Sequence, residues 1–324
     1  MSASTLTAGP AVTTAGPAPV PSAPRRSRRR GRALIIGFLA PALLVYVTFV
    51  LLPVALAAVY SFFNWNGLSA LDRFIGFDNY ARALGDPVFQ GAIVHNLAIV
   101  GLSLVIQGPI AIGVALLLNR PLRGRTVIRV LIFVPYVLSE VIAGLAWKLL
   151  LQPQGPFDGL IAALGLGEVR QLWLADQSVV FWTLFFVLCW KYLGFAIILF
   201  LAGLQNVPDE LSEAAQIDGA SWWQTQRHIT IPLLAPTIRI WAFLSIIGSL
   251  QQFDMVWILT GGGPVNATTT MATYMVQFGF QRSQLGYGSA VAVILFVVSL
   301  IFALLYQRFV LRRDFGASLT RGVG

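Results

Sequence analysis

The sequence carries little charge. Only 11% of its 324 residues are Asp, Glu, Lys or Arg, whereas 57% are hydrophobic, and the mean hydropathy is +0.76. A soluble globular domain carries about 25% charged residues. This shortage excludes an ordinary soluble domain and indicates a polytopic membrane protein. The net charge of +9 does not indicate nucleic-acid binding, because the basic residues cluster beside apolar segments, where they act as topology signals.

Several chemical motifs are also absent from the sequence. The single cysteine, Cys189, excludes an intrachain disulfide. No glycine-rich phosphate loop of the form GxxxxGK(S/T) occurs, so ATP binding by this chain alone is not expected. His95 and His228 are isolated, which argues against a metal site. No serine-centred nucleophile motif occurs. The sequence therefore predicts a protein that is not an enzyme and that needs neither a metal nor a cofactor.

What the chain has instead is long apolar segments, and a helix needs roughly 20 apolar residues to cross a bilayer. Six such segments run at about 33–63, 93–118, 126–151, 178–203, 234–259 and 287–311. The predicted class is therefore all-α, a polytopic membrane protein with six transmembrane helices.

The segments at the two ends of the chain have a different composition. Residues 1–32 are rich in Ala, Pro, Ser and Thr and then in Arg, which predicts a disordered basic tail. The apolar run that follows exceeds the roughly 7–15 residues of a signal peptide, and no cleavage site follows it, so we expect a retained helix. Residues 314–324 are expected to form a second short tail.

Arginine is distributed unevenly between the connections. The outer connections hold only Arg73, Arg82, Arg170 and Arg282 when the N-terminus is placed inside. The inner side then receives the tail arginines, the C-terminal arginines and a cluster between the second and third segments. That cluster comprises Arg120, Arg123, Arg125 and Arg129. By the positive-inside rule, both termini are predicted to be cytoplasmic. The connection at 206–236 is then cytoplasmic as well.

This connection is the most informative part of the sequence, and residues 213–236 read EAAQIDGASWWQTQRHITIPLLAP. Pro208 and the acidic residues after it match the first turn of a helix, and Gly219 matches the turn that ends one. We therefore expect two short helices joined at a sharp bend, with a surface thin enough to enter a cleft in a partner. The alternative from spacing alone is an ordinary amphipathic connection along the membrane surface.

The loop resembles the EAA loop of the membrane subunits of binding-protein-dependent ABC importers. Three further stretches look like the sugar and glycerol-phosphate permeases of that family, and they occur in the expected order. They are residues 76–96 (GFDNYARALGDPVFQGAIVHN), 118–135 (LNRPLRGRTVIRVLIFVP) and 259–270 (LTGGGPVNATTT). The resemblance implies one six-helix transmembrane domain at 33–313, with coupling helices in the loop at 206–236.

The resemblance also implies a function and a set of partners. The chain would be a permease subunit in a bacterial plasma membrane that passes a sugar or oligosaccharide to the cytoplasm. Its partners would be a second homologous permease, a dimer of cytoplasmic ATP-binding subunits and an extracellular solute-binding protein or lipoprotein. In the family, a short helix of the EAA loop enters a cleft in the ATPase. The implied ATPase-coupling residues are Glu213, Ala214, Ala215, Asp218, Gly219 and Ala220.

A second group of residues is expected to line a substrate path. Ser245, Ser249 and Gln252 are spaced i, i+4 and i+7, so they share one face of a helix. Polar side chains at this depth face a bundle interior or a cavity. In the family, this helix and the preceding one line the sugar site. The implied path residues are Lys191, Tyr192, Phe195, Ser245, Gly248, Ser249 and Gln252. The alternative for the serines and Gly248 is close helix packing.

Lys191 leaves several interpretations open. A charge within a membrane segment is a functional candidate by default, which favours contact with substrate. Trp190 and Tyr192 flank it, however, and such aromatic residues favour the membrane interface. The lysine would then extend outward, or pair with Asp254.

The alternative function is a secondary transporter driven by an ion gradient. Such a protein needs an intramembrane carboxylate or an unwound helix for the coupling ion. Asp254 and Glu140 are the acidic candidates, and both lie near predicted helix ends. The EAA-like loop would have no purpose in such a protein. A membrane-anchored signalling protein is discounted, because the sequence holds no recognisable soluble domain.

Overall fold

The computed structural model describes residues 27–120, 123–167 and 171–311. This part of the chain is helical and has no strand beyond an isolated bridge between Phe63 and Phe74. The predicted all-α class is confirmed. The described chain divides after Val54 into two units, which are taken separately below.

The first unit holds helix α1 (Ser27–Tyr46) and the π-helical turn η1 (Val47–Leu51). Helix α2 (Leu52–Tyr60) continues into the second unit. An unbroken apolar helix runs from Ile36 to Tyr60 and is long enough to cross a membrane. Because α1 begins at Ser27, it includes the end of the tail predicted as disordered. The rest of that tail and the tail predicted at 314–324 lie outside the described residues.

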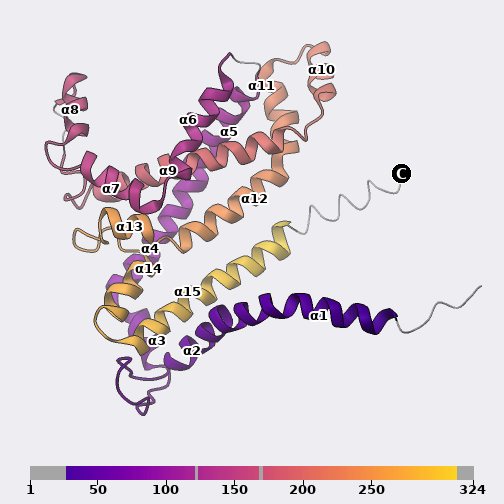
Figure 1. Cartoon of the computed structure of the whole chain (residues 1–324). Coiled ribbons are helices and arrows are strands. Elements are labelled where there is room, and N and C mark those ends of the chain that lie inside the picture. The colour runs from indigo at the N-terminus through magenta and orange to yellow at the C-terminus, as the bar shows by residue number, and fades with distance from the viewer. Residues whose placement is uncertain (1–26, 121–122, 168–170, 312–324) are drawn as a thin grey trace, which may run out of the picture. The chain divides into compact units, whose positions relative to one another are not determined.

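The second unit holds the remaining helices (Figure 1). Its first half comprises α3 (Asp78–Gly85), α4 (Pro87–Leu102), η2 (Ser103–Gln107), α5 (Gly108–Leu118), α6 (Arg125–Val137), α7 (Glu140–Leu150) and α8 (Pro156–Ala163). Its second half comprises α9 (Val180–Leu204), α10 (Asp209–Ile217), α11 (Trp222–Thr225), η4 (Gln226–Thr230), α12 (Ile231–Leu250), α13 (Asp254–Leu259), α14 (Met271–Tyr274), η5 (Met275–Phe280), α15 (Leu285–Tyr306) and η6 (Gln307–Leu311).

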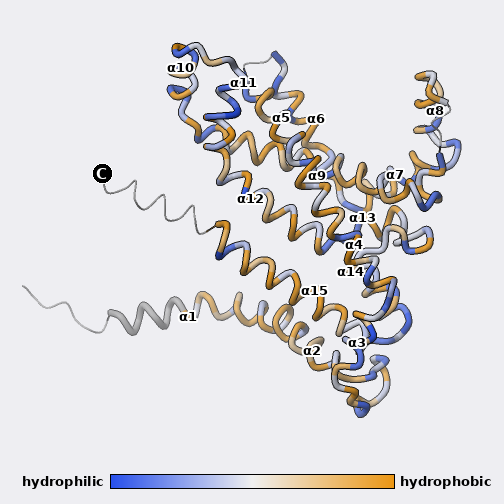
Figure 2. The backbone as a smooth tube through the Cα atoms, turned by 180° about the vertical axis from the view of Figure 1, so that it is seen from behind, coloured by the Kyte–Doolittle hydropathy of each residue, from blue (hydrophilic) through white to orange (hydrophobic). Residues whose placement is uncertain are grey.

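The described residues form five helices long and apolar enough to cross a membrane, and a sixth span if the bent pair α6–α7 counts as one. The four in the second unit are Pro87–Leu118, Val180–Leu204, Trp222–Leu250 and Leu285–Leu311. Figure 2 shows these helices as mainly hydrophobic, with hydrophilic residues gathered in the connections. The six predicted segments are therefore recovered.

Two of those segments contain a break whose position the sequence analysis did not predict. The segment 126–151 bends by 97° between α6 and α7, and the segment 234–259 breaks between α12 and α13. At the first break, Leu138 leaves the helical region with ψ 142°, and the hydroxyl of Ser139 then caps α7 by accepting from the backbone N–H of Ile142 at 3.2 Å. A serine before a new helix is a common N-cap.

Prolines explain where other spans change their winding. Three π-helical turns end two residues before Pro53, Pro109 and Pro232. A proline inside a helix removes one N–H donor, and its ring crowds the carbonyl group four residues earlier. In each case that carbonyl lies within the π-helical turn. The wider turn relieves the crowding, so the span continues beyond the proline.

Helix α9 is the centre of the second unit. Of its most apolar 18-residue window, 56% is buried, compared with 22–28% in the other three spans of this unit. It packs against α5, α6, α12 and α13. Gly194 allows the close approach of α6, because a Cβ atom there would stand 2.2 Å from the carbonyl oxygen of Ile132. Such an approach is possible only without a side chain.

The connections sort to different ends of this unit. In both views, α10, α11, the end of α5 and the start of α6 lie at one end, whereas α3, α13 and α14 lie toward the other (Figures 1 and 2). The guanidinium group of Arg120 stands 4.2 Å from the ring centre of Trp222, which ties the α5 end to α11 by a cation–π contact. The two inner connections predicted to be cytoplasmic thus share one end.

Candidate functional site

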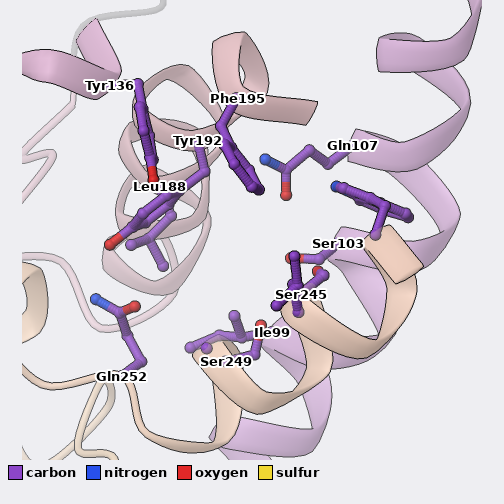
Figure 3. Close-up of a pocket in the computed structure, with 13 residues that line it drawn as sticks. Ile99, Ser103, Gln107, Tyr136, Leu188, Tyr192, Phe195, Ser245, Ser249 and Gln252 are labelled. Atoms are coloured by element: carbon purple, nitrogen blue, oxygen red, sulfur yellow. The ribbon is translucent and has the colours of Figure 1, made fainter. Parts of the chain in front are cut away.

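A cavity of about 280 Å³ lies among α4, η2, α6, α9 and α12. Its aromatic members are Tyr136, Tyr192, Phe195 and Trp241. Its polar members are Ser103, Gln107, Ser245, Ser249 and Gln252. Figure 3 shows the labelled aromatic rings on one side and Ser103, Ser245 and Ser249 on another, with the Gln107 amide beside Phe195 and Gln252 farther away. The cavity thus combines flat apolar surfaces with hydroxyl and amide groups.

The aromatic side is held by ring contacts. Tyr136 on α6 stacks on Phe195 of α9, with ring centres 5.0 Å apart and planes inclined by 23°. Tyr192 stands one turn before Phe195, and its hydroxyl group donates to Glu140 Oε1 at 2.9 Å. This side is therefore made by two helices in contact.

The polar side is fixed by a buried amide. Asn96 on α4 is fully buried, and its Nδ2 group donates to the backbone carbonyls of Ser249 and Leu250 at 2.6 and 3.2 Å. Its Oδ1 atom accepts from the N–H of Met271 at 2.8 Å. The end of a helix leaves carbonyl groups without partners, and Asn96 satisfies two of them. The α12 residues of the cavity are held in place by these bonds.

Six of the seven residues predicted for the path line this cavity. They are Tyr192, Phe195, Ser245, Gly248, Ser249 and Gln252. Gln252 lies just beyond the end of α12 and still faces the cavity (Figure 3). A Cβ atom at Gly248 would meet nothing within 4 Å, so within this chain Gly248 is not a close-packing position. Ser249 is only 7% exposed, and a packing role stays open for it.

Lys191 is the exception, since it does not line the cavity. Its side chain is 2% exposed, and its Nζ group donates to the backbone carbonyls of Pro135, Tyr136 and Leu138. The carboxylate that it faces is Glu140, with Nζ 3.8 Å from Oε1. The two alternatives of an outward-extended side chain and of pairing with Asp254 are therefore contradicted. Lys191 instead satisfies carbonyl groups at the end of α6, and the sequence alone did not predict this role.

The cavity also contains residues that the sequence analysis missed. Ser103 and Gln107 are spaced i and i+4 within an apolar span, the same signal that identified Ser245 and Ser249. Applied to the second apolar segment, that criterion finds them. Tyr136 and Trp241 carry no comparable signal, because an aromatic residue in an apolar segment is equally typical of packing.

The 206–236 loop folds as two helices around a left-handed turn. The N–H of Gly219 bonds to the carbonyl of Gln216 at 3.1 Å, and the N–H of Ala220 bonds to that of Ala215 at 2.9 Å. This pair of bonds, with Gly219 at φ +82°, is a Schellman ending of α10. Ser221 and Gln224 then form a capping box that starts α11. The predicted bend and the short helix before it are therefore confirmed, but the second helix is not short, because α11 is the first turn of the span Trp222–Leu250.

The residues predicted for coupling are presented outward by this turn. Glu213, Ala214, Asp218 and Gly219 are exposed, Ala220 is half-buried, and only Ala215 is buried. Ile217 at the tip of α10 is 87% exposed, which leaves a large apolar side chain uncovered beside them. The loop thus offers small and acidic residues with an apolar tip.

The fold and the loop together define a helical membrane protein with a cavity between its helices and an exposed α10–α11 loop at one end. Residues 107–314 match the family described as "Binding-protein-dependent transport system inner membrane component". The chain belongs to this family, and it is a membrane-spanning permease subunit of an ABC importer. The family predicted from the sequence is confirmed.

Named relatives are similar over most of their length. The multiple sugar-binding transport system permease of Streptococcus mutans is 36% identical, over 81% of this chain and 89% of its own. The diacetylchitobiose uptake permease of Streptomyces coelicolor is 32% identical, and the match covers 91% of this chain and 89% of that protein. A crystal structure of a bacterial ABC transporter that imports the acidic polysaccharide alginate matches with a TM-score of 0.77 and 25% identity, covering 90% of this chain and 99% of that one.

Proposed function

We propose that this permease passes a sugar or a short oligosaccharide through the cavity between α9 and α12. The observation that carries the proposal is the composition of that cavity, in which Tyr136, Tyr192 and Phe195 face hydroxyl and amide side chains. Aromatic rings present flat apolar surfaces to the C–H faces of sugars. Serine and glutamine side chains supply both donors and acceptors for sugar hydroxyls. The similarity to sugar-transport permeases supports the same substrate class.

The partners in this proposal follow from the resemblance and from the exposed loop. The chain works with a second homologous permease, a dimer of ATP-binding subunits in the cytoplasm and an extracellular solute-binding protein. One solved relative is the alginate transporter in complex with a periplasmic protein that carries an alginate pentasaccharide. Both termini and the α10–α11 loop face the cytoplasm, which agrees with the shared end of the arginine-rich connection and the loop. The partner subunit hydrolyses ATP.

Energy transfer in this proposal uses α10 and α11. The small residues at Ala214, Gly219 and Ala220 enter a cleft of the ATPase, and closure of the ATPase dimer moves the loop as a unit. Because η4 and α12 continue directly from α11, a displacement of the loop reaches the cavity wall through one span, Trp222–Leu250. The alternative of an ion-gradient transporter has no support from the family. Of its two candidate carboxylates, Glu140 is engaged by Tyr192 and Lys191.

The test is uptake by cells that produce the complete importer. Labelled maltose, trehalose, diacetylchitobiose and an alginate trisaccharide are offered singly, with and without depletion of ATP. We expect concentrative uptake of at least one sugar, its loss on ATP depletion, and copurification of an ATP-binding subunit with this chain. Uptake that persists without ATP but collapses with the ion gradient would overturn the mechanism. Absence of uptake for every sugar, with a copurifying ATPase, would overturn the substrate class alone.

A further inference from the structure

The break between α6 and α7 has an unusual electrostatic arrangement. The end of α6 presents carbonyl groups, which form the negative end of a helix dipole, and the start of α7 presents N–H groups at a positive end. Both ends meet at Leu138 and Ser139 in the middle of an apolar segment. Exposed helix ends at this depth are costly unless other groups satisfy them.

Two side chains of opposite charge complement these ends. The ammonium group of Lys191 donates to three carbonyls at the end of α6, including that of Tyr136 at 3.2 Å. Glu140 lies in the first turn of α7, where a negative charge is favoured. Lys191 and Glu140 stand 3.8 Å apart. The bend is therefore stabilised from both sides by one ion pair, in which Lys191 is buried and Glu140 is partly exposed.

Lys191 can reach these carbonyls because of Gly194, one turn further along α9. With no side chain at Gly194, the backbone of α6 approaches closely at Ile132 and Phe133. This approach brings the last turn of α6 over the middle of α9. Lys191 therefore bonds to the backbone of Tyr136 itself, while the Tyr136 ring lines the cavity and stacks on Phe195.

We propose that Lys191 is a positioning residue for the path: its ammonium group holds the α6–α7 bend and thereby fixes the Tyr136 ring on the cavity wall, so that it sets which sugars the path accepts. Lys191 acts through the backbone of α6 and does not touch the sugar. The inference rests on the proposed function for its effect on sugar choice, but its effect on Tyr136 is independent of any sugar.

Three variants separate this role from others. Lys191→Met keeps an unbranched side chain that is one heavy atom shorter, but removes the charge and all donors. Lys191→Arg keeps a cation at the same place. Lys148→Met removes a lysine charge from the bent pair itself without touching the junction, because Lys148 is exposed in the last turn of α7. If Lys191→Met yields no complex, Lys191→Gln replaces it, because the amide still donates to carbonyl groups but carries no charge.

The first measurement needs no sugar. In the assembled importer, Cys189→Ser removes the single cysteine of the chain, and Tyr136→Cys places a thiol on the cavity wall. The rate at which a small water-soluble thiol reagent modifies this chain is followed by its mass. We expect Lys191→Met to change that rate roughly fivefold, the effect of a coupling of about 1 kcal/mol. Lys191→Arg and Lys148→Met should leave it near the parent value.

The second measurement is the ratio of kcat/KM for the two sugars that the wild-type importer takes up fastest. We expect Lys191→Met to shift this ratio, to reproduce the shift of Tyr136→Ala, and to add nothing to it in the double variant.

An unchanged thiol rate overturns the positioning role. An unchanged ratio, or an additive double variant, overturns the effect on sugar choice. Failure of both Lys191→Met and Lys191→Gln to assemble assigns Lys191 to folding and overturns the proposal. A wild type without sugar uptake refutes the proposed substrate class but leaves the thiol result intact.

Discussion

The α10–α11 loop and the α6–α9 junction each depend on a glycine, but for different physical reasons. Gly219 in the loop has φ +82°, and a Cβ atom there would meet nothing within 4 Å. Gly194 in the junction lies within α9, and a Cβ atom there would stand 2.2 Å from the carbonyl oxygen of Ile132. The first glycine shapes the backbone and leaves space around it, whereas the second removes a side chain so that two helices can touch.

This difference separates two kinds of failure. A side chain added at Gly194 has to displace backbone atoms of α6, so the chain itself loses stability. A side chain added at Gly219 strains one turn and projects outward from the loop, so the effect on the chain alone is small. The loss of function then depends on what the partner can accommodate. A side chain at Gly194 should therefore lower stability more than uptake per assembled complex. A side chain at Gly219 should lower uptake more than stability.

The largest effect is expected for Gly194→Ala. Overpacking of this kind costs about 1–3 kcal/mol when side chains yield, and here the obstacle is backbone. We expect a lower thermal unfolding temperature and a lower yield of assembled complex in detergent. The matched control is Gly113→Ala in α5, where a Cβ atom would meet nothing within 4 Å. That variant should equal or exceed the wild type, since alanine favours a helix by about 0.5–1 kcal/mol. If Gly194→Ala unfolds at the same temperature as the wild type, the close approach of α6 to α9 is contradicted.

The next largest effect is expected for Gly219→Val. It is measured as the loss of uptake in cells whose membranes contain the variant chain at the wild-type amount. A non-glycine residue at this φ costs about 1–2 kcal/mol, and a branched side chain projects toward the ATPase. Gly165→Val is the control, because Gly165 has φ +77° and equally open surroundings but lies after α8, outside the loop. We expect Gly219→Val to lose uptake and ATPase copurification, while Gly165→Val keeps both. Glu213→Lys should resemble Gly219→Val. Normal uptake by Gly219→Val and Glu213→Lys would refute the role of this loop.

The sequence predicted the loop better than the junction, and the reason is locality. The signals for α10 lie within a dozen residues: Pro208 at its start, acidic residues in its first turn and Gly219 at its end. The ending depends only on backbone hydrogen bonds between neighbours, so composition is sufficient to predict it. The extents of the membrane spans were predictable for a similar reason, since length and hydropathy determine what can cross a bilayer.

The junction depends on contacts far apart in the chain. Lys191 bonds to carbonyls 53 to 56 residues earlier, and Asn96 bonds to carbonyls 153 and 154 residues later. No local sequence pattern predicts contacts between residues this far apart in the chain. The polar pair Ser139–Glu140 inside an apolar segment was a visible sign of the α6–α7 break, but hydropathy averaging conceals two residues in twenty. The same limit explains why the contacts of Lys191 with the end of α6 were not among the interpretations that the sequence offered.

A smaller effect is expected for Gln252→Leu, which changes a side chain of the cavity wall. Its backbone carbonyl still accepts from the Thr270 hydroxyl, so the break after α12 is preserved. The lost amide leaves a sugar hydroxyl unpaired, which costs about 1–3 kcal/mol, so KM should rise roughly tenfold. Gln251→Leu is the control, because its side chain is exposed and does not line the cavity. Reduced complex yield with unchanged KM would instead assign Gln252 to packing.

The smallest effect is expected for Gly248→Ala, and it distinguishes a path residue from a packing residue. Close packing predicts a loss of stability like that of Gly194→Ala. The open surroundings of Gly248 predict instead an unchanged or slightly raised unfolding temperature, because the helix gains about 0.5–1 kcal/mol. The added methyl group narrows the cavity where the sugar passes. KM should therefore rise more for a trisaccharide than for a disaccharide, in uptake measured with both at several concentrations. Equal KM changes for the two sugars, with a lowered unfolding temperature, would place Gly248 in a contact with the partner permease rather than on the path.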